Sequence, residues 1–136
     1  MRFDAIGGGA LPALPIKLTH SRRRARKIIA AIEGRRCAEE YDQMPAADAT
    51  TSNMYDERAG QLVHLVWISP DAGRSAADDV GLLAHEAVHV VRSYLAGIGE
   101  DEPSEELCAY LVQDVAGYLA AKHFEWKKRA IAREEK

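Results

Sequence analysis

The feature that most constrains this chain is a long stretch, from Asp78 to about Ala96, in which apolar residues recur with the period of an α-helix. Gly97 and Gly99 mark its end. One apolar stripe along such a helix seats it against a core. The chain has 136 residues, 47% of them hydrophobic, which is enough for one core and too little for two. The sequence therefore predicts a single domain over 1–136, with this helix packed on its core.

Turn-forming and helix-capping residues divide the rest of the chain into short segments. Two strand-like segments joined by turn formers predict a β-hairpin. The second, rich in β-branched and aromatic residues, is expected to be an edge strand beside the long helix. In chain order, the expected elements are an irregular arm (1–15), a short strand (16–19), a helix capped by Ser21 and ending near Glu33, a loop or frayed turn (37–48) and the hairpin (49–55 and 61–69). The long helix follows, then a further helix from about 103 to 123 or beyond, and a charged C-terminal extension (127–136) that extends or frays this helix. The expected fold class is α+β with a small antiparallel sheet.

The overall charge of the chain is modest, but its distribution is uneven. A formal net charge of -3, with 29% charged residues, argues against a nucleic-acid or membrane-surface binder. Basic residues gather between Ser21 and Arg36, where a solvated helix face is the expected outcome and nucleic-acid attachment the weakest alternative. Acidic residues dominate from Asp78 to Asp114. That stretch contains two histidines and suits a cation site.

No segment predicts secretion or membrane insertion. Glycines and prolines interrupt the first fifteen residues, which therefore lack the apolar centre of a signal peptide. No apolar run approaches the roughly 18 to 20 residues that a membrane span needs. The expected location is the cytoplasm in which the chain is made. Cys37 and Cys108 form no C-x-x-C pair and are expected to be reduced thiols, with a disulfide as the minor alternative.

Within the long helix, the residues from Gly81 to Val90 read GLLAHEAVHV. His85 and His89 are one turn apart and project within roughly 40° of each other. Both imidazoles can therefore reach one Zn²⁺ ion at about 2.0 to 2.1 Å. Glu86 flanks the same face, where a carboxylate can take a proton from a water that attacks a carbonyl group. This is the chemistry of the H-E-x-x-H pattern, so the sequence predicts zinc binding with Glu86 as the catalytic base.

A catalytic zinc site usually has three protein ligands and one open position. The extended pattern with a third histidine fails here, because Arg92 and Leu95 stand where its glycine and last histidine would be. The acidic start of the following helix is the alternative source. Its glutamates rank, from first to third choice, as Glu106, Glu105 and Glu102.

The preference for Glu106 comes from its position on the helix. Glu106 shares a stripe with Tyr110 and Gln113, so a ligand and its polar supports would face one cleft. Glu105 points about 100° away from that stripe. Tyr110 has two competing interpretations, a catalytic support for the ligand or oxyanion, and a core tyrosine with its hydroxyl at the surface.

The other histidines and the tryptophans carry weaker signals. His64 alternates with apolar residues in its strand and is expected to be satisfied or solvent-facing rather than a ligand. His20 and His123 fall at expected element ends, which requires no functional explanation. Trp67 and Trp126 are expected to be packing residues.

Two segments, GLLAHEAVHV and GEDEPSEELCAYLVQD, resemble a small zincin-like, gluzincin-type metallopeptidase family encoded by tailed bacteriophages and prophages. That family carries a P-S-x-E…A-Y signature in the helix after H-E-x-x-H. The matching residues here are Pro103, Ser104, Glu106, Ala109 and Tyr110. The resemblance is best over residues 80–113, about a quarter of the chain. Cys108 stands where a polar or acidic residue is expected.

The resemblance implies a minimal zincin-like domain in which His85, His89 and Glu106 bind Zn²⁺ and Glu86 is the base. The expected function is a zinc-dependent peptidase or amide hydrolase that acts on a protein or peptide substrate. The alternative is a catalytically idle zincin-fold structural or assembly protein of a phage, with other phage structural proteins as partners. The resemblance also implies a location in the bacterial host cytoplasm or in the virion.

Overall fold

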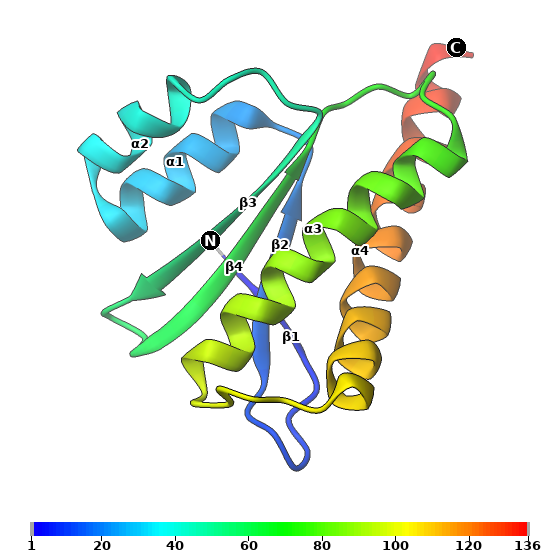
Figure 1. Cartoon of the computed structure of the whole chain (residues 1–136). Coiled ribbons are helices and arrows are strands. Elements are labelled where there is room, and N and C mark those ends of the chain that lie inside the picture. Colours follow the sequence, from blue (N-terminus) through cyan, green and yellow to red (C-terminus); the bar gives the residue numbers. More distant parts are fainter. Residues whose placement is uncertain (1, 136) are drawn as a thin grey trace.

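The computed structural model describes residues 2–135 as a mixed α+β fold, in which a four-stranded sheet has helices on both faces (Figure 1). The strands are β1 (Asp4–Ile6), β2 (Leu14–Thr19), β3 (Ala49–Asp56) and β4 (Gln61–Ile68). They lie in the order β1-β2-β4-β3. The coarse α+β prediction is therefore confirmed.

The sheet is mixed rather than antiparallel. β1 pairs antiparallel with β2, β2 pairs parallel with β4, and β3 and β4 form the expected antiparallel hairpin. The expectation that the second hairpin strand is the edge strand is wrong, since β3 lies at the edge and β4 lies inside the sheet. The physical reason is burial on both faces, because six consecutive residues from Val63 to Ile68 are buried.

Helices α1 (Arg22–Glu33) and α2 (Arg35–Asp42) cover one face of the sheet (Figure 1). Ser21 caps α1 by accepting a 3.0 Å hydrogen bond from the Arg24 amide, as expected for an N-cap serine. Gly34 ends α1 with a φ of 98°, a conformation that favours glycine. The prediction of a loop over 37–48 is wrong for the first part of that range, because α2 forms there and buries Ala38 and Tyr41 against the core.

Helices α3 (Ala76–Gly97) and α4 (Glu105–Glu134) cover the opposite face (Figure 1). α3 approaches β4 closely at its C-terminal end, where a Cβ added to Gly97 would lie 2.9 Å from the Leu62 side chain. α4 runs on beyond His123 through most of the charged segment, so of the two alternatives expected from Lys127, extension or fraying of the helix, extension is the one formed.

Two further expectations need correction. The first fifteen residues are not an irregular arm throughout, because Asp4–Ile6 pairs with residues 14–16 of β2. Val80 and Val88, placed on the buried stripe by the helical period, are 51% and 43% exposed.

Within residues 2–135, no helix has both the length and the apolar character required to cross a membrane.

Candidate functional site

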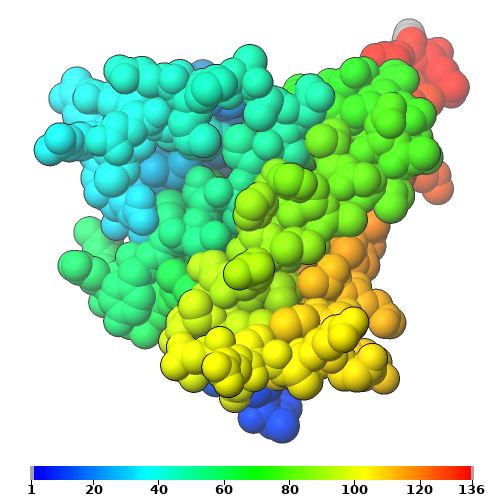
Figure 2. All heavy atoms as spheres, in the orientation of Figure 1, coloured from blue at the N-terminus to red at the C-terminus, as the bar shows by residue number. Residues whose placement is uncertain are grey.

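His85 and His89 lie side by side on the outer face of α3. Their Nε2 atoms are 3.2 Å apart, and their ring centroids are separated by 4.9 Å. Both side chains are exposed. Figure 2 shows this helix, in yellow-green, crossing the middle of the view with the orange start of α4 beside it. The structure therefore brings the two predicted ligands together at the surface.

The packing of α3 explains why these histidines face solvent. The core-facing residues of the helix include Leu83, Ala87 and Val90, all at most 1% exposed. At 100° per residue, His85 and His89 project roughly opposite to that buried stripe. Burying the apolar stripe therefore turns both imidazoles outward, toward solvent.

Glu86 lies on the side of α3 that faces the edge strand. Its side chain is only 5% exposed, and its Oε2 accepts a 2.6 Å hydrogen bond from the Thr51 hydroxyl of β3. A buried carboxylate needs such a partner, because leaving it without one costs several kcal/mol. Thr51 thus holds the Glu86 side chain between the helix and the edge strand.

The acidic candidates at the start of α4 are placed differently from one another. Glu105 lines a groove that also includes Val88 and Arg92 of α3. Glu106 and Tyr110 are exposed and do not line that groove, and Tyr110 is 61% exposed. Across residues 2–135, no three His, Cys, Asp or Glu side chains form a group that could hold a metal ion. Glu102 is also exposed.

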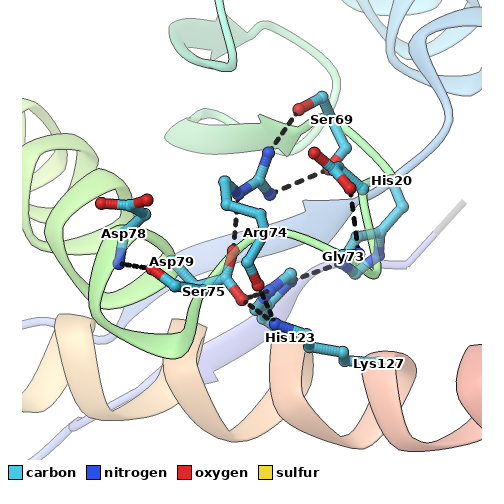
Figure 3. A network of polar contacts seen from close by, with 10 residues as sticks. His20, Ser69, Gly73, Arg74, Ser75, Asp78, Asp79, His123 and Lys127 are labelled. Carbon is cyan, nitrogen blue, oxygen red and sulfur yellow. Dashed lines mark hydrogen bonds and ion pairs between the residues drawn. The ribbon is translucent and has the colours of Figure 1, made fainter.

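A second cluster of chemically active side chains surrounds Asp79, in the first turn of α3 (Figure 3). Asp79 is fully buried and accepts hydrogen bonds from Arg74 Nε at 2.6 Å and Lys127 Nζ at 2.7 Å. His123 Nε2 lies 3.0 Å from Asp79 Oδ2, within ion-pair distance. Lys127 also donates to the Arg74 carbonyl. This cluster joins the β4–α3 loop, α3 and α4.

The cations around Asp79 determine its charge. Burial by itself would raise the pKa of the Asp79 carboxyl. Contacts from Lys127, Arg74 and His123 outweigh that effect and lower the pKa to about 2. Asp79 is therefore ionised at neutral pH, as an internal counter-charge to Arg74 and Lys127.

The cluster continues from His123 to the end of β2. His20 Nε2 lies 3.0 Å from His123 Nδ1, and Trp126 stacks on His20 with ring centroids 4.0 Å apart. Burial, followed by the proximity of His123, lowers the pKa of His20 to about 4. Sequence reasoning missed this cluster. The available signal was Asp79 itself, which falls on the buried face of α3 four residues before Leu83.

His64 is fully buried on β4, so the solvent-facing alternative is wrong. Its Nδ1 lies 2.6 Å from Asn53 Oδ1 on the neighbouring strand, while its Nε2 has no hydrogen-bond partner among residues 2–135. Burial lowers the pKa of His64 to about 4, which keeps the ring neutral at physiological pH. His64 is thus a half-satisfied core histidine.

Similarity to known proteins does not assign this chain to a family. Comparisons with protein-family models, with curated proteins and with solved structures each find no match. The functional argument therefore depends on the positions of the side chains. Of the two clusters, the Asp79 cluster has Arg74 and Lys127 engaged within the protein, whereas His85 and His89 are exposed on α3 and contact each other through their Nε2 atoms.

Proposed function

We propose that this protein is a zinc-dependent peptidase or amide hydrolase with a minimal zincin-like fold, in which His85 and His89 bind the metal. The observation that carries the proposal is the 3.2 Å separation of the two Nε2 atoms. Two ligands at 2.0 to 2.1 Å from one tetrahedral ion lie roughly 3.3 to 3.4 Å apart. The separation of the two Nε2 atoms therefore matches that of two ligands of one zinc ion.

The arrangement of elements around the pair supports a zincin-like reading. In zincins, the metal-binding helix lies beside a sheet whose edge strand aligns an extended peptide. Here α3 packs on the sheet, and β3 at the edge contacts Glu86 through Thr51. The exposed main-chain groups of β3 are suited to pairing with an extended substrate.

The third ligand is expected from the start of α4, and two glutamates compete for the role. The family resemblance favours Glu106, whereas the groove between α3 and α4 includes Glu105. Either side chain has to move toward the histidines, since no three-residue group is formed in the described part of the chain. Both residues are exposed in the first turn of α4, where rotamer changes meet little packing resistance.

Glu86 is the proposed general base. Zinc bound at the pair would supply Lewis-acid polarisation of the scissile carbonyl. Glu86 would accept a proton from the attacking water and deliver it to the leaving amine. Thr51 is a positioning residue, because its hydroxyl donates a hydrogen bond to one oxygen of the Glu86 carboxylate.

A specific observation favours a second function. No third ligand stands with the histidines among residues 2–135, and the Glu86 carboxylate is already engaged by Thr51. Both features suit a catalytically idle zincin-like module that serves as a structural or assembly protein of a phage. Its partners would be other structural proteins of the particle.

Metal analysis combined with one substitution tests the proposal. Purified protein should contain about one zinc per chain. Wild-type protein should cleave members of a mixed peptide library, and Glu86→Gln should abolish cleavage while retaining zinc, because glutamine keeps the contact with Thr51 but cannot accept the proton. Glu105→Gln and Glu106→Gln form a matched pair, and the true ligand is the one whose loss weakens zinc binding.

Each result has a distinct meaning. Zinc without cleavage in the wild type supports the idle module and contradicts the hydrolase. Cleavage that survives in Glu86→Gln removes Glu86 from the mechanism. Protein that binds no zinc, even when zinc is supplied, contradicts both versions of the site.

A further inference from the structure

The basic residues of α1 and α2 fall into two groups. Four of them bind a partner within the protein, namely Arg22, Arg26, Arg35 and Arg36. The other three, Arg23, Arg24 and Lys27, are exposed and form no ion pair within residues 2–135. Together with Ser21 they line a hollow of about 230 Å³. We call these three cations the basic face.

The cations of the basic face repel one another. Lys27 lies three residues after Arg24 and four after Arg23, and side chains at these spacings are neighbours on a helix. Like charges so placed destabilise the helix, and no acidic residue lies in the first turn of α1 to offset them. An acidic partner on the basic face would therefore relieve this repulsion as well as form new ion pairs.

The connection between α3 and α4 carries the opposite charge. Five of the seven residues at positions 100–106 are acidic. All five are exposed, and none forms an ion pair in the part of the chain that the structure describes. They are Glu100, Asp101, Glu102, Glu105 and Glu106, and we call them the acidic face. Arg92 lines the same concavity as Glu100 and Asp101 and offsets one of these charges.

The fold keeps the two faces apart. α1 begins three residues after Thr19, which pairs with Trp67 near the end of β4. α3 ends at Gly97, which approaches Leu62 near the start of β4. The strand from Leu62 to Trp67 spans about 17 Å, and α1 and α3 cover opposite faces of the sheet (Figure 1).

This separation prevents the two faces from neutralising each other within one chain. It exceeds the distance over which exposed charges interact, which is about 8 Å at physiological ionic strength. Figure 2 shows the surface around residue 100, in yellow, apart from the surface of α1 and α2, in blue and cyan. Each face therefore needs a partner from outside the chain.

We infer that the basic face of one copy docks on the acidic face of a second copy, in a weak head-to-tail contact that depends on salt. A second copy supplies a complementary partner to both faces, whereas a nucleic acid would match the basic face alone. Exposed ion pairs contribute little each, so charge steers the encounter more than it holds the complex. The contact requires neither zinc nor Glu86.

A head-to-tail contact has a structural consequence. Because the two faces are different patches, a pair of copies still has one free face of each kind. Further copies can therefore add at both ends, and the assembly grows into a filament or closes into a ring. Such growth would give the protein a role in assembly in addition to the proposed hydrolysis.

Sedimentation velocity at two salt concentrations tests the contact. At about 10 mM salt, where charges act over about 30 Å, the weight-average sedimentation coefficient should rise with protein concentration. At about 1 M salt, screening shortens that range to about 3 Å, and the coefficient should stay at the monomer value. EDTA in both buffers ensures that zinc shared between two copies does not contribute.

A matched pair of double variants locates the basic side of the contact. Arg24→Gln with Lys27→Gln should weaken the association constant about tenfold at low salt, through the loss of two exposed ion pairs. Arg35→Gln with Arg36→Gln removes the same charge from exposed arginines outside the basic face and should leave the constant nearly unchanged. Circular dichroism checks that both proteins remain folded.

A mixing experiment tests the head-to-tail arrangement. Glu100→Gln with Asp101→Asn weakens the acidic face, and this protein should be largely monomeric at low salt, as should Arg24→Gln with Lys27→Gln. In a mixture, the intact basic face of the first protein meets the intact acidic face of the second. The mixture should therefore form pairs and stop at two copies.

Several results would overturn the inference. Wild-type sedimentation that is independent of concentration at low salt removes the contact, and association that persists at 1 M salt indicates an apolar contact instead. Equal weakening by Arg35→Gln with Arg36→Gln assigns the effect to net charge, and a mixture that stays monomeric excludes the head-to-tail arrangement. A single-stranded oligonucleotide that binds the basic face while the protein stays monomeric assigns that face to nucleic acid. Zinc content and peptide cleavage, measured separately, report on the proposed hydrolase.

Discussion

Two histidine pairs in this protein have similar internal geometry and opposite surroundings. The ring nitrogens are 3.0 Å apart in the pair formed by His20 and His123, and 3.2 Å apart in the pair formed by His85 and His89. The first pair is backed by the buried carboxylate of Asp79 and covered by a tryptophan. The second pair lies exposed on one helix.

The comparison indicates what each pair can do. Buried donors that are bonded to a buried carboxylate hold their helices and loops together. Separating the donors from the carboxylate would leave buried charges without partners. Exposed imidazoles one turn apart contribute little to folding, but their two Nε2 atoms can bind a metal ion once the hydrogen bond between them is given up. We therefore expect the first pair to affect stability and the second to affect metal binding.

The largest expected effect is at Asp79. Asp79→Asn leaves the buried cations Arg74 and Lys127 without their counter-charge, and should lower the free energy of unfolding by about 3–5 kcal/mol. Urea denaturation followed by circular dichroism measures the change. Asp78→Asn, at the exposed neighbour in the same turn, should cost about 0.3–1 kcal/mol from the helix dipole alone. Similar losses in the two variants would contradict the structural role of the cluster.

Acid should destabilise the protein in two successive pH windows. The pKa values of His20 and His64 are about 4 in the folded protein, against about 6.5 in the unfolded chain. The unfolded chain therefore binds protons first, and stability falls as pH drops from about 6.5 to 4. The loss at pH 5 is about 2 kcal/mol for the fully buried His64 and less for the partly exposed His20, whose charge is screened by solvent. Asp79, with a pKa of about 2, adds a loss between about pH 4 and 2.

Urea midpoints at pH 7, 5 and 3 measure these windows. His20→Gln should flatten part of the first window and leave the second in place. Stability that does not change between pH 7 and pH 5 would show that neither histidine is held neutral by burial.

A smaller effect is expected at the contact between the edge strand and α3. Thr51→Val removes the hydroxyl that donates to the buried Glu86 carboxylate. The loss of this hydrogen bond should cost about 1.5–3 kcal/mol. Thr50→Val, which removes a 3.2 Å contact with the Tyr41 hydroxyl on the opposite face, should cost about 0.5–1 kcal/mol. A Thr51 variant as stable as wild type would mean that Glu86 is free to move.

The smallest stability effect is expected at the exposed pair. His85→Ala and His89→Ala should each change the free energy of unfolding by no more than about 0.5 kcal/mol without zinc. Thermal unfolding with and without added zinc should show stabilisation of the wild type alone. A large loss of stability without metal would mean that these imidazoles are structural.

Local patterns in the sequence predicted most of the helices and strands. The pairing of the strands and the burial of individual side chains became visible only in the structure. The cap at Ser21 and the stop at Gly34 placed α1, because both signals act within one turn. The parallel pairing of β2 with β4 depends on contacts between residues far apart in the chain, so the strand order was not predicted.

In the candidate site, too, the sequence predicted what local spacing decides and missed what depends on tertiary packing. The spacing of His85 and His89 fixed their shared face, because i and i+4 side chains meet on any α-helix. The position of Glu106 relative to them depends on how α4 rotates against α3, which the helical period leaves undetermined. The Asp79 cluster combines side chains from three separate segments, and no spacing rule relates them.

X-ray absorption spectroscopy of the zinc-loaded protein tests the central claim most directly, because it counts imidazole ligands around the metal. The account predicts two imidazole nitrogens at about 2.0 to 2.1 Å in the wild type, and one in His89→Ala where zinc is retained. A spectrum with no imidazole ligand, or one that is unchanged in His89→Ala, would contradict it.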